Sequence, residues 1–497
     1  MDIYLHIFDL PVEVLICIFE FLDSLSLERV VDASKRFSDI LLASKRLQSN
    51  LTLNIHSKLY YNDMINQSRK LPYKTVNFMR HQDDEIYSDT LEPFVIYDVL
   101  ANLHKHVDKI QVFNIGILWT MKIFAICDNL KELRIIDDDN LVLFETTTVV
   151  NFPVLKVLEI RCSGYCDVLY SIEARNLEKL IIHKSFANLT TFLMKTEKLK
   201  VLKIYDGCVD DMQGWDTLKM RLTTLNLGLG NYRVYLSLRE LHEERTWTNT
   251  LGDFLKSQKS SLEDVALNFI VFEDKSYEIV NACLSQLKLK KLSLKIDKNV
   301  TKFNKLSVNN SIKTLKFEGY TSDDNLKHLI SCCPQVTSLI LNFNALIGSN
   351  IFDHISKLMQ NLKVFEINSS TLQISDKIIL KNVEKLKIYL LNQDLWHQLA
   401  MICPNLKELE LIDKTIKADP LEIQKVLSKC QNLQTITFNA GMDFICKDGF
   451  FDVFTDKNVK VKRINFHAVN FEHLFFSRVA LFTAKTNVQV CWRNNLY

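Results

Sequence analysis

The sequence predicts an α/β solenoid in which short parallel strands alternate with outer helices, preceded by a small all-helical domain. Three observations predict this fold class. One apolar template recurs through most of the chain, amphipathic helical patterns separate its copies, and an apolar helical segment precedes the first copy. The 497 residues are 47% hydrophobic and 24% charged, which is ordinary globular composition with enough apolar side chains for a long core.

The first element is a short helix predicted from residues 10–23, LPVEVLICIFEFLD. Proline suits the first turn of a helix, so this helix should begin near Pro11. Apolar residues at helical spacing form one face, and further apolar residues lie on a different side: Val14, Leu15, Ile18, Phe19 and Leu22 against Val12, Ile16 and Phe21. A small domain cannot cover both sides, and surplus apolar surface usually binds a partner protein.

Two further helical patterns, in residues 24–37 and 37–48, complete a predicted helical domain over residues 1–48. Residues 1–28 contain six acidic residues and no Lys or Arg, which argues against a secretory signal. No stretch approaches the ~18 apolar residues that a membrane helix requires. The twelve cysteines include no CxxC pair and fit reduced thiols. We therefore expect a cytoplasmic and/or nuclear protein with no membrane partner.

The repeat begins after this domain and is predicted to occupy residues 49–497. Thirteen segments fit the template LxxLxL, and most of their first apolar positions are 21 to 27 residues apart. They start at residues 129, 154, 176, 198, 221, 261, 288, 311, 335, 361, 382, 405 and 432. Looser copies at 49–55, 73–78, 106–112, 461–466 and 488–492 bring the expected number of repeats to about 14–17.

Each template copy predicts a strand, because its LxL ending alternates between a buried and an open face. The segments between copies have helical apolar spacing, as in Leu326, Leu329 and Ile330. Stacked copies should place parallel strands on a concave side and helices outside. One interval is longer, and residues 230–260 could be a binding insertion with Tyr232 and Trp247 as contacts, or equally a degenerate repeat.

This template resembles the leucine-rich repeat over most of the chain. Helix ends with the sequences CPQV (333–336), CPNL (403–406) and CQNL (430–433) resemble the cysteine-containing subtype of that family. In that subtype the cysteine closes the outer helix, and we expect these thiols to be packed in the core.

The first 48 residues resemble the F-box over residues 8–48, with LPxEVLxxIFxxLD followed by a Leu/Val helix and then a basic pair before Phe37. The resemblance implies docking on the Skp-type adaptor of a cullin–RING ubiquitin ligase. The residues that would bind the adaptor are Leu10, Pro11, Val14, Leu15, Ile18, Phe19 and Leu22. A cap helix that only shields the first repeat remains the alternative for this segment.

In that family the repeat array selects a protein substrate, whose identity the sequence does not reveal. Substrate-binding candidates on the concave face are Arg134, Lys203, Tyr205, Lys316, Glu366, Lys387, Tyr389 and Glu410. Lys385 and Lys387 stand one repeat before Glu408 and Glu410, so we expect charges to pair across strands. With 61 basic and 59 acidic residues, the chain has no charge excess that favours nucleic acid.

The sequence contains no motif of catalytic residues, no clustered Cys/His metal ligands and no glycine-rich phosphate loop. We therefore expect no cofactor, no metal and no catalysis by this chain. The expected function is that of a substrate receptor in a ubiquitin ligase. The alternative is a leucine-rich-repeat scaffold or inhibitor with no ligase role, and the first 48 residues distinguish the two.

Overall fold

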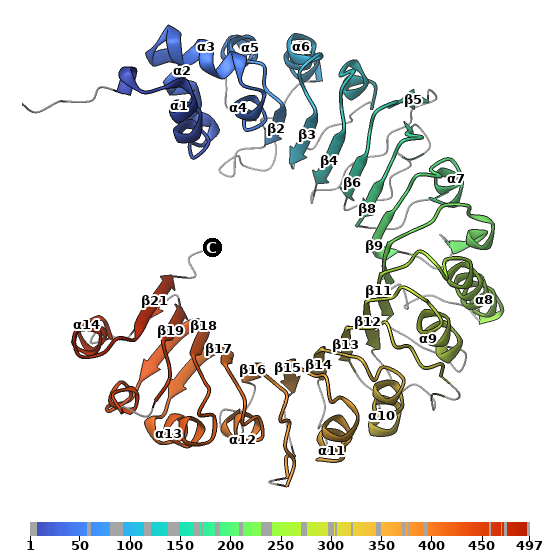
Figure 1. Cartoon of the computed structure of the whole chain (residues 1–497). Helices are drawn as coiled ribbons and strands as arrows, with labels where there is room; N and C mark the ends of the chain where they lie inside the picture. The colour runs from blue at the N-terminus through green and yellow to red at the C-terminus, as the bar shows by residue number, and fades with distance from the viewer. Residues whose placement is uncertain are drawn as a thin grey trace, which may run out of the picture. The chain divides into compact units, whose positions relative to one another are not determined.

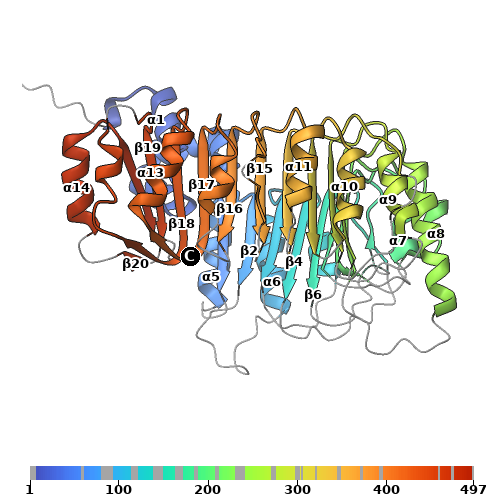
Figure 2. The same cartoon turned by 90° about the horizontal axis from the view of Figure 1, so that it is seen from below.

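The computed structural model describes residues 7–56, 61–79, 93–113, 121–137, 149–162, 169, 172–183, 189–207, 212–229, 241–269, 276–296, 303, 306–319, 322–343, 349–369, 373–375, 377–390, 396–456, 459–468, 470–471 and 475–494. It divides into two compact units, Met1–Thr250 and Leu251–Tyr497. Each unit has an α/β architecture, with parallel strands side by side and helices packed against one face of them (Figure 1, Figure 2).

The first unit begins with short helices: η1 (Ile7–Asp9), α1 (Val12–Phe19), α2 (Ser24–Ala33), α3 (Lys35–Ala43) and α4 (Lys45–Gln48). Asp23 caps α2 by accepting a hydrogen bond from the backbone N–H of Ser26 at 2.8 Å. This bond to the backbone of Ser26 lowers the pKa of the Asp23 carboxyl. These helices share a core of side chains that are at most 1% exposed: Leu15, Phe19, Leu27, Leu41 and Leu47.

The main sheet of the first unit follows. Its strands are β1 (Thr52–His56), β2 (Thr75–Met79), β3 (Lys109–Phe113), β4 (Glu132–Asp137), β6 (Val157–Cys162), β8 (Lys179–Ile182), β9 (Val201–Gly207) and β10 (Thr224–Leu229). Each pairs in parallel with the next. β5 (Val150–Asn151) and β7 (Ile172–Glu173) form a separate short pair. The connecting helices are α5 (Tyr61–Lys70), α6 (Pro93–Leu103), η2 (Met121–Ile126), α7 (Leu189–Leu193) and η5 (Trp215–Thr217), and α8 (Leu241–Ser257) follows the sheet.

The second unit repeats this arrangement. Its strands are β11 (Asp264–Phe269), β12 (Lys291–Ile296), β13 (Thr314–Gly319), β14 (Ser338–Phe343), β15 (Val364–Ser369), β16 (Lys385–Leu390), β17 (Glu408–Ala418), β18 (Thr435–Cys446), β19 (Arg463–Ala468) and β21 (Gln489–Asn494). All pair in parallel, and β20 (Asn470–Phe471) adds to the far end of β18. The helices are α9 (Ser276–Leu284), α10 (Asp323–Ser331), α11 (Ser349–Leu358), α12 (Trp396–Met401), α13 (Pro420–Lys429), η6 (Asp452–Phe454) and α14 (Phe475–Lys485).

The strands fall where the apolar template predicts them, including the looser copies. In β14, Leu339 and Leu341 are fully buried while Ser338, Ile340 and Asn342 are half-buried on the opposite side. The buried side faces the helices, so the core of each unit lies between its strands and its helices. The other side is the open face of the sheet. Within each unit the α/β architecture with parallel strands is therefore confirmed, and it is compatible with the predicted solenoid.

The cysteines at the helix ends are buried, as the repeat subtype implies. The Cys430 thiol follows α13 and donates to the carbonyls of Ala400 and Cys403 at 3.3 and 3.5 Å. Burial raises the pKa of Cys333 and that of Cys430 to about 12. These thiols stay neutral and act as small apolar groups that join neighbouring repeats.

The segment between β12 and β13 forms no helix in its described part, and a buried asparagine organises it instead. Asn309 donates to the carbonyls of Leu284 and Gln286, each at 2.8 Å. Its side-chain oxygen accepts from the backbone N–H groups of Ser311 and Ile312. One side chain thus satisfies carbonyls at the end of the preceding repeat and N–H groups of the turn before β13.

Among the helices described, none combines the length and the apolar character that crossing a bilayer requires.

Candidate functional site

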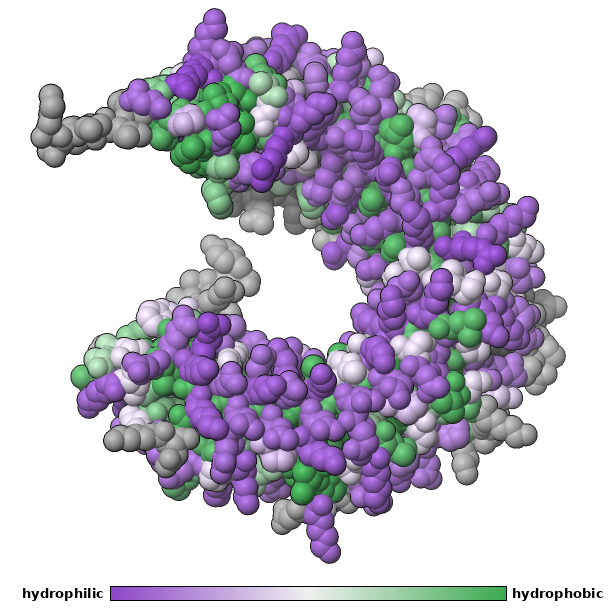
Figure 3. Space-filling model, viewed as in Figure 1, coloured by the Kyte–Doolittle hydropathy of each residue, from purple (hydrophilic) through white to green (hydrophobic). Residues whose placement is uncertain are grey.

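The N-terminal helices carry a cluster of exposed apolar side chains, which we name the N-terminal apolar surface. Its members are 38–91% exposed: Ile7, Phe8, Val12, Val14, Ile18, Phe21 and Leu25. Figure 3 shows apolar side chains gathered over these helices, whereas polar side chains cover most of the neighbouring repeats. A cluster of this kind on a water-exposed helical domain is typical of a protein-binding surface.

The structure divides the seven predicted adaptor-binding residues. Val14 and Ile18 are 41% and 38% exposed and lie on this surface, and Pro11 is exposed beside them. Leu10 and Leu22 are half-buried.

Leu15 and Phe19 are only 0% and 1% exposed, because α1 packs on α3 and the edge of the Phe19 ring meets Phe37 at 5.3 Å. They support the surface from inside the chain. Phe21, which is 91% exposed, was not among the predicted residues, although its place beside the helical face was visible in the sequence.

A basic side chain and an aromatic stack hold the start of this surface in place. Arg36 on α3 donates to the backbone carbonyls of Phe8 and Leu10, the latter at 3.0 Å. The ring of Phe8 stacks on that of Phe37. These contacts fix the segment before α1, so the apolar side chains of Ile7 and Phe8 are presented in one arrangement.

The predicted substrate-binding residues all lie on the open face and are half-buried there: Arg134, Lys203, Tyr205, Lys316, Glu366, Lys387, Tyr389 and Glu410. Within the second unit, the strand register places Lys316, Glu366, Lys387 and Glu410 in one row across successive strands. In the first unit, Arg134 and Lys203 share a corresponding row. The template therefore identified one continuous face within each unit.

Charges on this open face largely neutralise one another. Lys385 pairs with Glu408 at 2.9 Å, as the sequence predicts. Lys387 lies 4.0 Å from the carboxylate of Glu366 and 5.4 Å from the ring centroid of Tyr389. Burial alone would lower the pKa of Lys387, but the charges of Glu410 and Glu366 outweigh it and raise that pKa.

The same pairing occurs in the first unit, where Arg134 bonds Glu132 at 2.5 Å and approaches Glu159 at 3.5 Å. Next to these, the ring of His183 stacks on that of Tyr205, with centroids 4.7 Å apart. Asn226 on the following strand donates to the hydroxyl of Tyr205 at 3.5 Å. The open face thus presents charges that are mostly paired, together with polar and aromatic groups.

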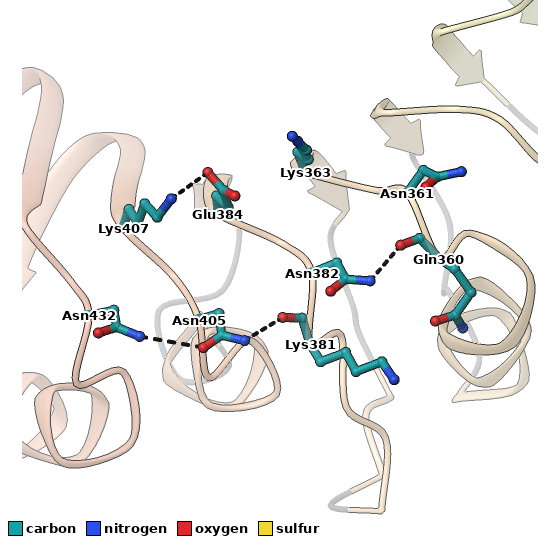
Figure 4. Close-up of a pocket in the computed structure, with 9 residues that line it drawn as sticks. All are labelled: Gln360, Asn361, Lys363, Lys381, Asn382, Glu384, Asn405, Lys407 and Asn432. Carbon is teal, nitrogen blue, oxygen red and sulfur yellow. Dashed lines mark hydrogen bonds and ion pairs between the residues drawn. The ribbon is translucent and has the colours of Figure 1, made fainter.

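A second site, which the sequence analysis missed, lies along the edge of the second unit where β15 to β18 begin (Figure 4). It is an open groove of about 440 Å³, and we name it the edge groove. Its lining is entirely polar: Gln360, Asn361, Lys363, Lys381, Asn382, Glu384, Asn405, Lys407 and Asn432. The available signal was an asparagine directly before the first apolar residue of four successive templates.

The asparagines of the edge groove join neighbouring repeats (Figure 4). The side-chain amide of Asn382 donates to the carbonyl of Gln360, and that of Asn405 donates to the carbonyl of Lys381 at 2.8 Å. Asn432 donates to the side-chain oxygen of Asn405 at 3.4 Å. Each amide nitrogen carries two hydrogens, and each of these bonds uses one of them.

The lysines of the edge groove are only partly neutralised. Lys407 pairs with Glu384 at 2.8 Å, and this bond lowers the pKa of the Glu384 carboxyl. Neither Lys363 nor Lys381 forms an ion pair with another described residue, and both are exposed. In Figure 4 no dashed line joins the side-chain nitrogen of either lysine to another residue drawn. The groove therefore has a net positive charge.

The remaining predictions concern metals and the long interval. Within the described ranges, no three His, Cys, Asp or Glu side chains are grouped so that they could hold a metal ion. Tyr232 lies outside the described residues, and Trp247 lies on α8 with its side chain outside them.

A scan against models of protein families finds no match to this chain, and a search of curated proteins finds none either.

Proposed function

We propose that this chain is the substrate-recognition subunit of a Skp–cullin–F-box ubiquitin ligase. The helices α1–α4 would dock on the Skp-type adaptor, and the repeat array would bind a protein substrate. The observation that carries the proposal is the N-terminal apolar surface. It belongs to helices whose own core is already filled by Leu15, Phe19, Leu27 and Phe37, so its exposure serves no internal packing.

The energetics of exposure support a partner at this surface. Each Å² of apolar area removed from water contributes roughly 25 cal/mol of favourable free energy. Binding of a partner that covers several of these side chains is therefore stabilised by their burial. Phe21 and Ile18 are the best anchors, because large apolar side chains at the centre of an interface carry most of its binding energy. The acidic residues Asp9 and Glu13 would lie at the polar rim.

In such a complex this chain contributes binding and positioning, and the chemistry belongs to other subunits. A rigid array that holds a substrate near an activated ubiquitin raises the effective concentration of the reacting groups. The parallel strands suit that task, because each is hydrogen-bonded along its length to its neighbours. The open face offers polar and paired charged groups, a composition that suits a protein surface better than a small apolar ligand.

Co-expression with a Skp-type adaptor tests the proposal. The chain should elute with the adaptor as a one-to-one complex in size-exclusion chromatography, and the complex should then recruit a cullin. If the chain elutes alone and folded in the presence of excess adaptor, the ligase proposal is wrong. A leucine-rich-repeat scaffold or inhibitor with a capping N-terminal domain would then be the better account.

A further inference from the structure

We infer that the edge groove of the second unit binds an extended, acidic segment of a partner protein. The starting observation is a row of residues that stand directly before the strands of this unit, which we name the edge row. Its members are Glu263, Lys290, Lys313, Thr337, Lys363, Glu384, Lys407, Gln434 and Lys462. They lie at the edge where the parallel strands begin.

The backbone fixes the spacing of this edge row. Each member from Lys290 onward donates its N–H to the carbonyl of the preceding member, at N···O distances of 2.7–2.9 Å. Neighbouring members therefore lie about 4.8 Å apart, the usual spacing of strands. Lys290 and Lys313 are neighbours in the row, whereas the later lysines alternate with Thr337, Glu384 and Gln434, so positive charge recurs at every first or second strand. No aromatic side chain interrupts the row.

The corresponding row in the first unit serves as an internal comparison. There, Lys131 pairs with Asp108 at 3.3 Å, and both Lys156 and Lys200 pair with Glu178 at 3.0 and 2.9 Å. Each of these three lysines thus forms an ion pair with an adjacent repeat, although Lys156 and Lys200 share one carboxylate. An edge lysine of this kind can therefore be explained by the ion pair that it forms between neighbouring repeats, without a partner protein.

The second unit departs from this pattern. Lys290 pairs with Glu263 and Lys407 pairs with Glu384, at 2.7 and 2.8 Å. Lys313, Lys363 and Lys462 are exposed and form no ion pair with a carboxylate among the described residues, although the charge of Lys363 contributes to the lowered pKa of Glu384. Lys381, in the turn before β16, adds a further unpaired charge to the edge groove. Within the described part of this edge, the lysines outnumber the carboxylates Glu263 and Glu384, and the excess positive charge fits an anionic partner.

The groove lining indicates which anion. Asparagine and glutamine side chains carry the same donor and acceptor groups as a peptide backbone, so they can bond an extended chain laid across them. Four successive strand starts, from Asn361 to Asn432, span roughly 14 Å, which an extended peptide covers with about four to five residues. Acidic side chains on that peptide would then meet Lys363 and Lys381.

Two other anions fit the lining less well. Single-stranded nucleic acid is usually held by aromatic side chains that stack on its bases, and no aromatic residue lines this groove. An anionic membrane surface is usually bound by lysines together with apolar residues that enter the lipid, and no apolar residue lines it either. The identification of the acidic segment as part of a ligase substrate rests on the proposed function, whereas the binding itself does not.

Peptide binding tests the inference with the full chain. The probe is a fluorescent peptide of about twelve alternating Glu and Ser residues, long enough to cross the groove, and the matched peptide carries Gln in place of Glu. Fluorescence anisotropy should detect binding of the Glu peptide and not of the Gln peptide. The double variant Lys363→Glu/Lys381→Glu should weaken binding about tenfold, because two favourable charges become unfavourable.

The control is a charge-matched double variant, Lys414→Glu/Lys417→Glu, on exposed positions of β17 outside the groove. It should change binding by less than about twofold. The neutral variant Lys363→Gln/Lys381→Gln should weaken binding of the Glu peptide less than the charge reversal does. It serves as a second variant in case the charge reversal impairs folding. If both reversal variants weaken binding equally, or if the Gln peptide binds as well as the Glu peptide, the inference is wrong.

The same variants distinguish an acidic protein segment from the other anions, and they test the groove separately from the ligase proposal. A single-stranded oligonucleotide or an anionic vesicle that binds more tightly than the Glu peptide, and loses binding in Lys363→Glu/Lys381→Glu, would overturn the assignment to a protein segment. The groove variants should still co-elute with the Skp-type adaptor. Failure of adaptor binding with intact peptide binding would contradict the proposed function alone.

Discussion

The ring of Phe8 stacks on the ring of Phe37, with centroids 4.8 Å apart and planes inclined by 9°. Phe37 also meets the edge of Phe19 at 5.3 Å, so one buried ring connects the segment before α1 with the core of the helical domain. An apolar surface that is held in place before binding loses less conformational entropy when a partner covers it. Phe37 therefore links the stability of the domain to the presentation of its surface.

The first prediction concerns this stack. Phe37→Ala should destabilise the helical domain by about 3 kcal/mol or more, because it removes a buried ring from contact with two others. Amide hydrogen exchange in α1 to α3 should rise accordingly. Phe21→Ala is the control, because Phe21 is 91% exposed and its loss should change the unfolding free energy by less than about 0.5 kcal/mol. Unchanged protection in Phe37→Ala would contradict this assignment.

Two glycines give a matched pair of backbone predictions. Gly319 ends β13 with φ +107°, and a Cβ there would lie 1.9 Å from the carbonyl oxygen of Ile296. Gly319→Ala should therefore cost roughly 3 kcal/mol of stability. Gly252 lies in α8, and a Cβ there would meet nothing within 4 Å, so Gly252→Ala should stabilise by up to about 1 kcal/mol. Thermal melts that shift in the same direction would contradict this account.

The asparagines should differ in importance according to burial. Asn309 is 5% exposed and satisfies backbone donors and acceptors on both of its polar atoms. Asn309→Ala should cost about 3 kcal/mol, because several buried groups lose their partners. Asn405→Ala removes two exposed bonds, one to the Lys381 carbonyl and a longer one from Asn432, and should cost about 0.5–1 kcal/mol. Urea denaturation of both variants measures the two losses of unfolding free energy. Equal losses would show that burial does not determine how much each asparagine contributes.

The buried cysteines predict a loss of stability at high pH. Burial raises the pKa of Cys283 to about 12 from an ordinary value of 9.0, so the unfolded chain releases this proton first as pH rises. Its contribution is complete below pH ~9 and declines above it, by about 1.4 kcal/mol per pH unit. Cys283→Ala should therefore lose less stability between about pH 9 and 11 than the parent chain, and parallel pH profiles would contradict this.

Thiol labelling provides the companion measurement. Cys17 is exposed on α1, whereas Cys283 and Cys333 are fully buried. An alkylating reagent applied to the native protein should modify Cys17 rapidly and leave the two buried thiols unmodified until the chain unfolds. Rapid modification of Cys333 in the native state would show that the helix ends open locally.

The fold was predictable from sequence because each repeat carries its own local signal. The alternation in residues 288–294, KLKKLSL, sufficed to place β12, and the register then follows because each strand must bury the same face. The continuation of β17 to Ala418 and of β18 to Cys446 was not predicted. Those extensions pair with each other beyond the seven residues that the template covers.

The candidate sites were only partly predictable. Helical spacing placed Leu15, Ile18 and Phe19 on one face of α1, but it could not show which part of that face α3 covers. The pairing of Lys385 with Glu408 was predicted, because residues in register on adjacent parallel strands must meet. The edge groove depends on which lysines lack a neighbouring carboxylate, and only the structure provides that information.

The most direct test of the central claim is the dissociation constant of the complex with a Skp-type adaptor, measured for the parent chain and for Phe21→Asp and Ile18→Asp. Both substitutions replace exposed side chains, so folding should be retained, and Leu481→Asp on α14 is the matched control, since Leu481 is 64% exposed. The account predicts tight binding by the parent chain and by Leu481→Asp, and a loss of about 100-fold or more in the two surface variants. Equal binding by all four proteins, or none by the parent chain, would contradict it.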